Sequence, residues 1–260
     1  GRTAPGPKVT NAKPGQSFHN YADHLKSLID KVEFTQENKI DEAANLIVEA
    51  IENGNSIFAF GASHAGMLSM ELFYRTGGLV NINPIFAADL MSNIRPATLT
   101  SDIERLEGYG TLILNNTSIK QGDVLILHSV SGRNAVTIDM GLEAKKKGIK
   151  VIVITNITYT SLVTSRHSSH LKLKDVGDIV IDNCGEFEDS SQKIRGVEQK
   201  MGPTSTVIGA FIVNGITLKV AEKLVEKGVE VPVFHSANID GGDEHNKALM
   251  EKYKNNIFYM

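Results

Sequence analysis

The chain has 260 residues, of which 41% are hydrophobic and 22% charged, and its formal net charge at pH 7 is −3. This length is sufficient for a full hydrophobic core, and the small net charge gives no electrostatic footprint of binding to nucleic acid or an anionic membrane. Because no apolar run approaches the roughly 20 residues of a membrane span and no secretory signal opens the chain, we expect a soluble, cytoplasmic protein.

The first 16 residues differ from the rest of the chain. Residues 1–16 contain three prolines and three glycines without apolar periodicity, which predicts a disordered extension or an expression remnant. Residues 17–260 are expected to form one domain. It opens at residues 17–54, where apolar side chains recur at helical spacing and predict one long helix or two.

Short apolar segments then alternate with helical ones. Strands are expected at 56–60, 82–86, 124–129, 151–155 and 179–181, and helices at 64–76, 134–147 and 204–227. Buried strands that alternate with helices are typical of a parallel α/β sheet with helices on both faces. Residues 95–121 give a weaker pattern, with short helices possible at 101–107 and 111–116, and we interpret them as an insertion near the active site. A tail from Val229, with a final helix near 244–253, lies outside the sheet pattern.

Two turns rich in small residues follow strands. Residues 129–134 (turn 2) read Ser-Val-Ser-Gly-Arg-Asn and stand between a strand and a helix, and residues 61–66 (turn 1) read Gly-Ala-Ser-His-Ala-Gly in the same setting. Such a turn directs N–H groups, hydroxyls and a helix N-terminus to one point, where a phosphate-sized anion can bind. The alternative for turn 2 is an ordinary helix cap at Ser131. Because both turns follow parallel strands, they predict one shared crevice.

A third turn of this kind precedes the long apolar helix at 204–227. Residues 202–206 (turn 3) read Gly-Pro-Thr-Ser-Thr, so that Thr204, Ser205 and Thr206 place three hydroxyls at a helix start. Proline and hydroxyl residues also suit helix capping alone, which is the alternative interpretation. Turn 3 becomes a candidate ligand site only beside the other two turns.

The helix expected after turn 1 carries an acid, a base and a cation. His64 and Glu71 are seven residues apart and Glu71 and Arg75 four apart, spacings that place all three on one helical face. A partly buried glutamate at a strand end can move a proton between adjacent carbons. The alternative is an exposed Glu71–Arg75 ion pair on the helix surface.

The tail contributes two further histidines. His235 and His245 flank a loop rich in polar residues and glycine, which either delivers an acid–base group to the site or is a solvated turn. No second histidine falls four residues from His245, and the single cysteine, Cys184, excludes a cysteine-cluster metal site. We therefore expect neither a metal nor a cofactor.

Together the three turns resemble the signature sites of the sugar isomerase (SIS) domain family, over about residues 40–228. Turn 2 looks like the family's Ser-x-Ser-Gly-x-Thr/Asn loop, which binds the phosphate of a phosphosugar. Turn 1 departs from the usual Gly-x-Gly-x-Ser, since one glycine precedes its serine. The resemblance implies a flavodoxin-like αβα sandwich with a five-stranded parallel sheet and a homodimer or homotetramer. It implies substrate binding by Gly61, Ser63, Ser129, Ser131, Gly132, Asn134, Thr204, Ser205 and Thr206.

The segment Met70-Glu71-Leu72 and Arg75 is similar to the Ala-Glu-Leu-x-x-Arg helix of phosphoheptose isomerases, in which the glutamate is an acid–base catalyst. That branch has a zinc-binding histidine where this chain has Met67, which argues against the metal. It also has a late catalytic histidine, a part that His245 or His235 could take here. The tail from Ser236 to Asp243 further resembles that of a related group of SIS proteins.

These observations favour an aldose–ketose isomerase for an anionic, phosphorylated sugar. In this hypothesis Glu71 moves the proton through a cis-enediol, and His64 or a tail histidine opens the ring or stabilises the oxyanion. Two alternatives remain open at this point. One is a lyase resembling the N-acetylmuramic acid 6-phosphate etherases, and the other is a non-catalytic phosphosugar sensor.

Overall fold

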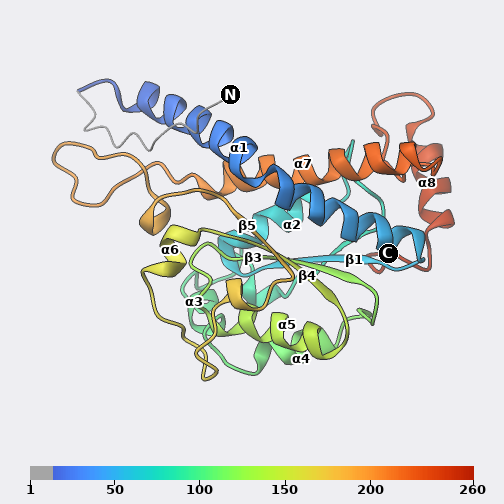
Figure 1. Ribbon diagram of the computed structural model, residues 1–260, viewed down its shortest axis with the longest axis horizontal. Helices are drawn as coiled ribbons and strands as arrows, with labels where there is room; N and C mark the ends of the chain where they lie inside the picture. Colours follow the sequence, from blue (N-terminus) through green and yellow to red (C-terminus); the bar gives the residue numbers. More distant parts are fainter. Residues whose placement is uncertain (1–13) are drawn as a thin grey trace.

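The computed structural model describes residues 14–260 (Figure 1). Of the extension expected at residues 1–16, positions 1–13 lie outside the described residues. Five strands form one sheet in which every neighbouring pair is parallel. Their order, with helices on both faces, confirms the expected flavodoxin-like sandwich. Across the sheet the strands are β2 (Ile82–Pro84), β1 (Ile57–Gly61), β3 (Val124–His128), β4 (Lys150–Thr155) and β5 (Ile179–Asp182).

Alternate side chains of each strand enter two hydrophobic layers. In β3, Val124 and Ile126 face one layer while Leu125 and Leu127 face the other, and all four are buried. Burying a side chain of this size stabilises the fold by about 1.5–3 kcal/mol. The first face is covered by α1 (Ser17–Glu52), α2 (Met67–Leu72) and α7 (Ser205–Glu226), and the second by α3 (Leu99–Ile103), α4 (Tyr109–Asn115) and α5 (Ala135–Lys146) (Figure 1).

The N-terminal helical region is one continuous helix rather than two. Its buried stripe, which includes Val32, Ile40 and Ile47, packs along α7 above the sheet. Smaller elements complete the connections. They are α6 (Ile157–Ser161) and four 3₁₀ turns, η1 (Ser63–Gly66), η2 (Ala88–Leu90), η3 (Leu173–Asp175) and η4 (Phe187–Asp189). None of the helices in residues 14–260 has the length and hydrophobicity needed to cross a membrane.

The helix expected at 64–76 is much shorter than its apolar pattern indicates. It starts as the 3₁₀ turn η1, and α2 ends at Leu72 because Phe73 is extended and Tyr74 has a φ of 43°. The ring of Phe73 lies 5.0 Å from that of Tyr259, and the ring of Tyr74 lies 5.3 Å from that of Phe234. These edge-to-face contacts with the tail replace the next helical turn.

The tail packs against the β2 edge of the sheet. After α8 (Gly242–Lys252), the last residues return to Asn83 of β2, whose side chain accepts a hydrogen bond from the Phe258 N–H at 2.7 Å and donates one to the Asn256 carbonyl at 2.9 Å. A small hydrophobic cluster lies beneath this segment and includes Val80, Phe234, Leu249 and Ile257. The tail therefore covers a strand edge that would otherwise be open.

Candidate functional site

The strand order creates a switch point between β1 and β3. The chain continues from β1 to β2 on one side and from β3 to β4 on the other, so the two connections diverge. Gly61 at the end of β1 lies opposite His128 at the end of β3. Turn 1 and turn 2 leave these two positions. In open α/β sheets ligands bind in the crevice at such a point.

Turn 1 folds back tightly on its own backbone. A Cβ added at Gly61 would lie 2.5 Å from the carbonyl carbon and oxygen of Ala65, and one at Gly66 would lie 2.8 Å from the Gly61 oxygen. Ser63 has a φ of 56°, in the left-handed region that residues with a side chain seldom adopt. Its hydroxyl lies 2.7 Å from the hydroxyl of Thr100. The turn therefore presents the Ser63 hydroxyl toward the insertion.

Turn 2 holds its shape through local contacts. The Gly132 N–H donates to the Ser129 hydroxyl at 3.1 Å, and Gly132 has a φ of 63°. The helix begins at Ala135, so the N-cap position belongs to Asn134 and not to Ser131. The Asn134 side chain makes no capping bond and turns outward, where its oxygen accepts from Arg166 at 3.1 Å. Its amide donates to Glu104, so both ends of the Asn134 side chain have partners beside the crevice.

The side chain of Glu104 joins turn 1 to turn 2. One carboxylate oxygen accepts from the Asn134 amide at 3.1 Å, and the other accepts from the Ser63 hydroxyl at 3.3 Å. Burial raises the pKa of Glu104, and the Ser63 hydrogen bond and the charges of Arg105 and Arg166 oppose this rise. Sequence reasoning missed Glu104, although it placed the insertion that carries it near the active site.

Turn 3 is capped by a carboxylate of the chain itself. Asp189 accepts from the Ser205 N–H at 3.0 Å and the Thr204 N–H at 3.3 Å, and its other oxygen accepts from the Ser205 hydroxyl. The Thr204 hydroxyl is buried and has no partner. Within residues 14–260, turn 3 makes no hydrogen bond to turn 1 or turn 2. The charge of Asp189 nevertheless acts on His128 at the end of β3.

His128 lies buried beneath turn 1. Its Nδ1 lies 2.9 Å from the Ala65 carbonyl, and its Nε2 has no partner. Burial lowers the pKa of His128, the Ala65 contact and Asp189 oppose this shift, and the nearby His64 adds to it. Sequence analysis placed His128 in the strand and gave it no role.

Because α2 is short, the single helical face that was predicted for His64, Glu71 and Arg75 does not form. His64 lies in η1, so it is not two α-helical turns from Glu71. Glu71 is ion-paired with Arg75 and accepts from the Asn214 amide of α7 at 3.1 Å. With side chains 32% and 48% exposed, Glu71 and Arg75 form a surface pair on the α7 side of the sheet. None of the hydrogen bonds of Glu71 joins it to the three turns.

The tail histidines contact each other rather than the turns. The rings of His235 and His245 stack with centroids 3.3 Å apart, and His245 Nε2 lies 3.3 Å from the Val233 carbonyl. The contacts of both histidines therefore lie within the tail. The single cysteine, Cys184, is buried, and burial raises its pKa to about 11. Its thiol is therefore not activated.

An apolar cavity opens beside turn 1. It has a volume of about 190 Å³ and lies between turn 1, α2 and the segment around η2. Apart from Gly61 and Ser63, its walls are mostly hydrophobic, and they include Met67, Met70, Ile85, Phe86, Leu90 and Met91. The cavity gives a ligand held by the Ser63 hydroxyl room to extend along the sheet.

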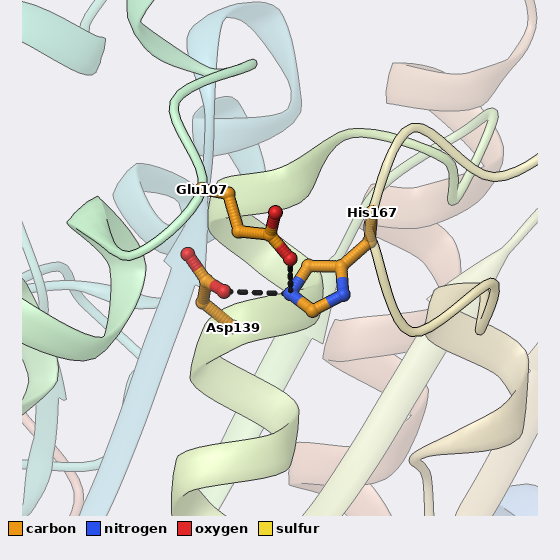
Figure 2. Close-up of side chains that lie close together, drawn as sticks. All are labelled: Glu107, Asp139 and His167. Atoms are coloured by element: carbon orange, nitrogen blue, oxygen red, sulfur yellow. Dashed lines mark hydrogen bonds and ion pairs between the residues drawn. The ribbon is translucent and has the colours of Figure 1, made fainter.

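Glu107, Asp139 and His167 form a polar cluster behind turn 2, in which Asp139 is buried and Glu107 is exposed (Figure 2). His167 Nε2 lies 2.8 Å from an Asp139 oxygen and 3.1 Å from a Glu107 oxygen. The second Asp139 oxygen accepts from the N–H groups of Gly108, at 2.7 Å, and Gly110, at 3.3 Å. The cluster therefore fastens the α3–α4 connection and the loop at 165–169 to α5.

The same cluster has the residue types of a metal site. The Ser169 N–H, however, donates to His167 Nδ1 at 3.1 Å, which leaves the imidazole proton on Nε2. A proton at Nε2 suits hydrogen bonds to two carboxylates and blocks the lone pair that a metal would need. The donor set therefore fits a hydrogen-bonded anchor better than it fits a metal centre.

A five-stranded parallel sheet with helices on both faces and small-residue turns at the strand ends defines the class of protein, and comparison with known proteins gives its family. The SIS domain is matched over residues 20–156, and the chain belongs to the SIS domain family. Within that family it groups with the UPF0309 proteins. One from Shouchella clausii is 50% identical over 240 residues, covering 92% of this chain and 98% of that one. One from Oceanobacillus iheyensis is 48% identical with the same coverage.

Solved structures share the fold at low sequence identity. A phosphoheptose isomerase from Francisella tularensis has a TM-score of 0.52 and 13% identity, and it covers 81% of this chain and 100% of its own. The NanR protein of Vibrio vulnificus, solved with ManNAc-6P, has a TM-score of 0.50 and 15% identity, with 92% of this chain and 69% of its own covered. At these identities the likeness shows the fold alone.

Proposed function

We propose that this protein binds a phosphorylated sugar at the three turns and is an aldose–ketose isomerase. The observation that carries the proposal is the contact of turn 1 and turn 2 with one carboxylate, that of Glu104. The donors that hold this carboxylate are of the kind that hold a phosphate or a sugar oxygen. In the proposal, Ser129, Ser131, Gly132 and Asn134 hold the phosphate, and Gly61, Ser63, Thr204, Ser205 and Thr206 position the sugar.

Isomerisation through a cis-enediol requires a group that moves a proton between C1 and C2. We assign this step to Glu71, as the likeness to phosphoheptose isomerases suggests, with His64 or His245 assisting. The proposal includes a homodimer or homotetramer, which light scattering of the purified protein tests. It also places the protein in the cytoplasm. Lactate release from an N-acetylmuramic acid 6-phosphate would instead indicate a lyase, and binding without any turnover would indicate a sensor.

Ligand binding is tested first, by thermal shift with the 6-phosphates of glucose, mannose, fructose and N-acetylglucosamine, sedoheptulose 7-phosphate and ribose 5-phosphate. Each is paired with its unphosphorylated sugar. We expect at least one phosphate, and none of the free sugars, to raise Tm, because stabilisation follows affinity. Ser131→Ala should weaken that binding about 10-fold or more, since it removes a hydrogen bond to a charged group. Ser101→Ala, at an exposed position of α3, is the control. Unchanged affinity in Ser131→Ala would contradict the assignment of turn 2.

The assignment of Glu71 is tested by turnover. With the sugar phosphate that gives the largest shift, Glu71→Gln should slow deuterium exchange at C2 by about 100-fold or more, while affinity stays near normal. Loss of its exposed ion pair costs only a few tenths of a kcal/mol, so folding is preserved. Glu251→Gln, which removes a similar exposed pair with Lys254, serves as the control. Wild-type exchange in Glu71→Gln would reject this role.

A further inference from the structure

We propose that Glu104 is a catalytic residue that opens the ring of the bound sugar phosphate. The inference rests on the proposed function, because an aldose–ketose isomerase must convert a cyclic substrate to its open-chain form before the enediol can form. It gives the ring-opening step to a side chain outside the set of His64, His235 and His245. Three observations support it: the carboxyl group of Glu104 lies between turn 1 and turn 2, its two oxygens contact Ser63 and Asn134, and its backbone is held by α5.

The side chain of Glu104 lies between turn 1 and turn 2, the two turns that leave the sheet at its switch point. One oxygen faces the Asn134 amide and the other faces the Ser63 hydroxyl, so each oxygen lies against a different turn. A sugar phosphate with its phosphate at Asn134 and its sugar at Ser63 comes within reach of the carboxyl group. Glu71, by contrast, contacts Arg75 and Asn214 on the α7 side of the sheet. The tail histidines stack on each other.

The hydroxyls beside Glu104 accommodate either protonation state. When the carboxylate is ionised, Ser63 donates to it. When the carboxyl is protonated, it can donate to Ser63, which then donates to the Thr100 hydroxyl 2.7 Å away. A chain of hydroxyls that reverses direction stabilises both forms, as an acid–base catalyst requires. Burial favours the protonated form and raises the pKa of Glu104.

The chemistry needs one carboxyl group and no co-reactant. The protonated oxygen of Glu104 gives its proton to the ring oxygen while the C1–O5 bond breaks and its electron pair goes to O5. The other oxygen takes the proton of the O1 hydroxyl, whose electron pair forms the C1=O1 bond. The carboxyl group is protonated again at the end, and the product is the open-chain aldehyde. Two oxygens facing two turns are suited to this exchange.

Glu104 is held firmly enough for such a role. Its backbone carbonyl accepts from the Val136 N–H of α5 at 3.1 Å. Three residues further on, Glu107 joins the cluster with Asp139 and His167, which fastens the segment to α5 again (Figure 2). Arg166, next to His167, holds the Asn134 side chain. The carboxyl group and one of its partners are thus positioned by the same anchor.

The test measures ring opening apart from isomerisation. Exchange between the anomers of the stabilising sugar phosphate is followed by NMR, and deuterium exchange at C2 reports the enediol step. Glu104→Gln preserves the shape and can still contact Ser63 and Asn134, but it cannot carry the proton. We expect anomer exchange to fall about 100-fold or more with binding within about 3-fold of wild type. Glu104→Asp should retain part of the activity. Asp102→Asn, which changes an exposed carboxyl of α3 two residues before Glu104, is the control.

The pH profile of the wild-type protein gives an independent readout that does not depend on how any variant folds. Because the protonated form donates, enzyme-catalysed anomer exchange should fall as pH rises through the raised pKa of Glu104. The charged groups that act on Glu104 are Arg105 and Arg166, and their positive charges oppose the rise in its pKa. The fall should be absent in Glu104→Gln. Asp102→Asn should retain it.

The outcomes separate this inference from the proposed function. If no sugar phosphate stabilises the protein, the proposed function fails, and this inference fails with it. If binding and C2 exchange proceed as expected but Glu104→Gln catalyses anomer exchange at the wild-type rate, only the role of Glu104 is overturned. A wild-type anomer exchange rate that does not change with pH would overturn it as well.

Discussion

Gly61→Ala is expected to abolish sugar-phosphate binding and to lower the free energy of unfolding by about 3 kcal/mol. The new Cβ would lie 2.5 Å from the backbone of Ala65, closer than any packed atoms approach. Since backbone cannot rotate aside as a side chain can, turn 1 must open, and the Ser63 hydroxyl leaves the crevice. Urea unfolding measures the stability, and the ligand-induced change in Tm measures binding.

A matched glycine shows whether the effect belongs to turn 1. Gly215 lies in the interior of α7, and nothing approaches within 4 Å of its added Cβ. Gly215→Ala should therefore stabilise the protein by up to about 1 kcal/mol, because alanine favours helix more than glycine does. It should leave ligand binding unchanged. If Gly61→Ala retained wild-type stability and binding, turn 1 could not have the tight geometry described above.

The sheet and its long helices could be predicted because their signals are local. Every expected strand is present within about two residues, and the helices expected at 134–147 and 204–227 correspond to α5 and α7. Strands buried on both faces must be continuously apolar, so β1, β3 and β4 are recognisable in the sequence alone. The boundaries of such elements follow from chemistry within a few residues of each end.

The end of α2 could not be predicted because its cause lies far away in the sequence. The apolar spacing continued past Leu72, but Phe73 and Tyr74 pack on aromatic rings of the tail, about 160–190 residues later. Such tertiary contacts override a local helical pattern. Because α2 ends early, Arg75 lies outside the helix that was expected to carry it.

The candidate site was predicted in part. Turns 1 and 2 lie at one edge of the sheet because parallel strands end together, a rule that needs no tertiary information. Glu104 was missed because it contacts Ser63 and Asn134 across 41 and 30 residues, and the segment that carries it has weak periodicity. Turn 3 was predicted as a candidate anion site, and its capping by Asp189 depends on a loop with two left-handed residues, Glu188 and Asp189.

The anchor cluster leads to the second prediction of large effect. Asp139→Asn should lower the free energy of unfolding by about 2–3 kcal/mol, even though the side chain keeps its size. The asparagine oxygen can still accept from Gly108 and Gly110, but its amide then faces the protonated Nε2 of His167. The ring cannot change tautomer to relieve this, because the Ser169 N–H occupies Nδ1.

A double-mutant cycle distinguishes this clash from a general loss of charge. In Asp139→Asn with His167→Gln, the glutamine oxygen can accept from the asparagine amide, so the pair should recover about 1 kcal/mol or more of the loss. Glu143→Gln, one turn further along α5, should change stability by less than about 0.5 kcal/mol. Additive effects of the two single variants would show that no direct bond joins Asp139 to His167. The cluster would then not be the anchor that holds Glu104 and Arg166 beside the crevice.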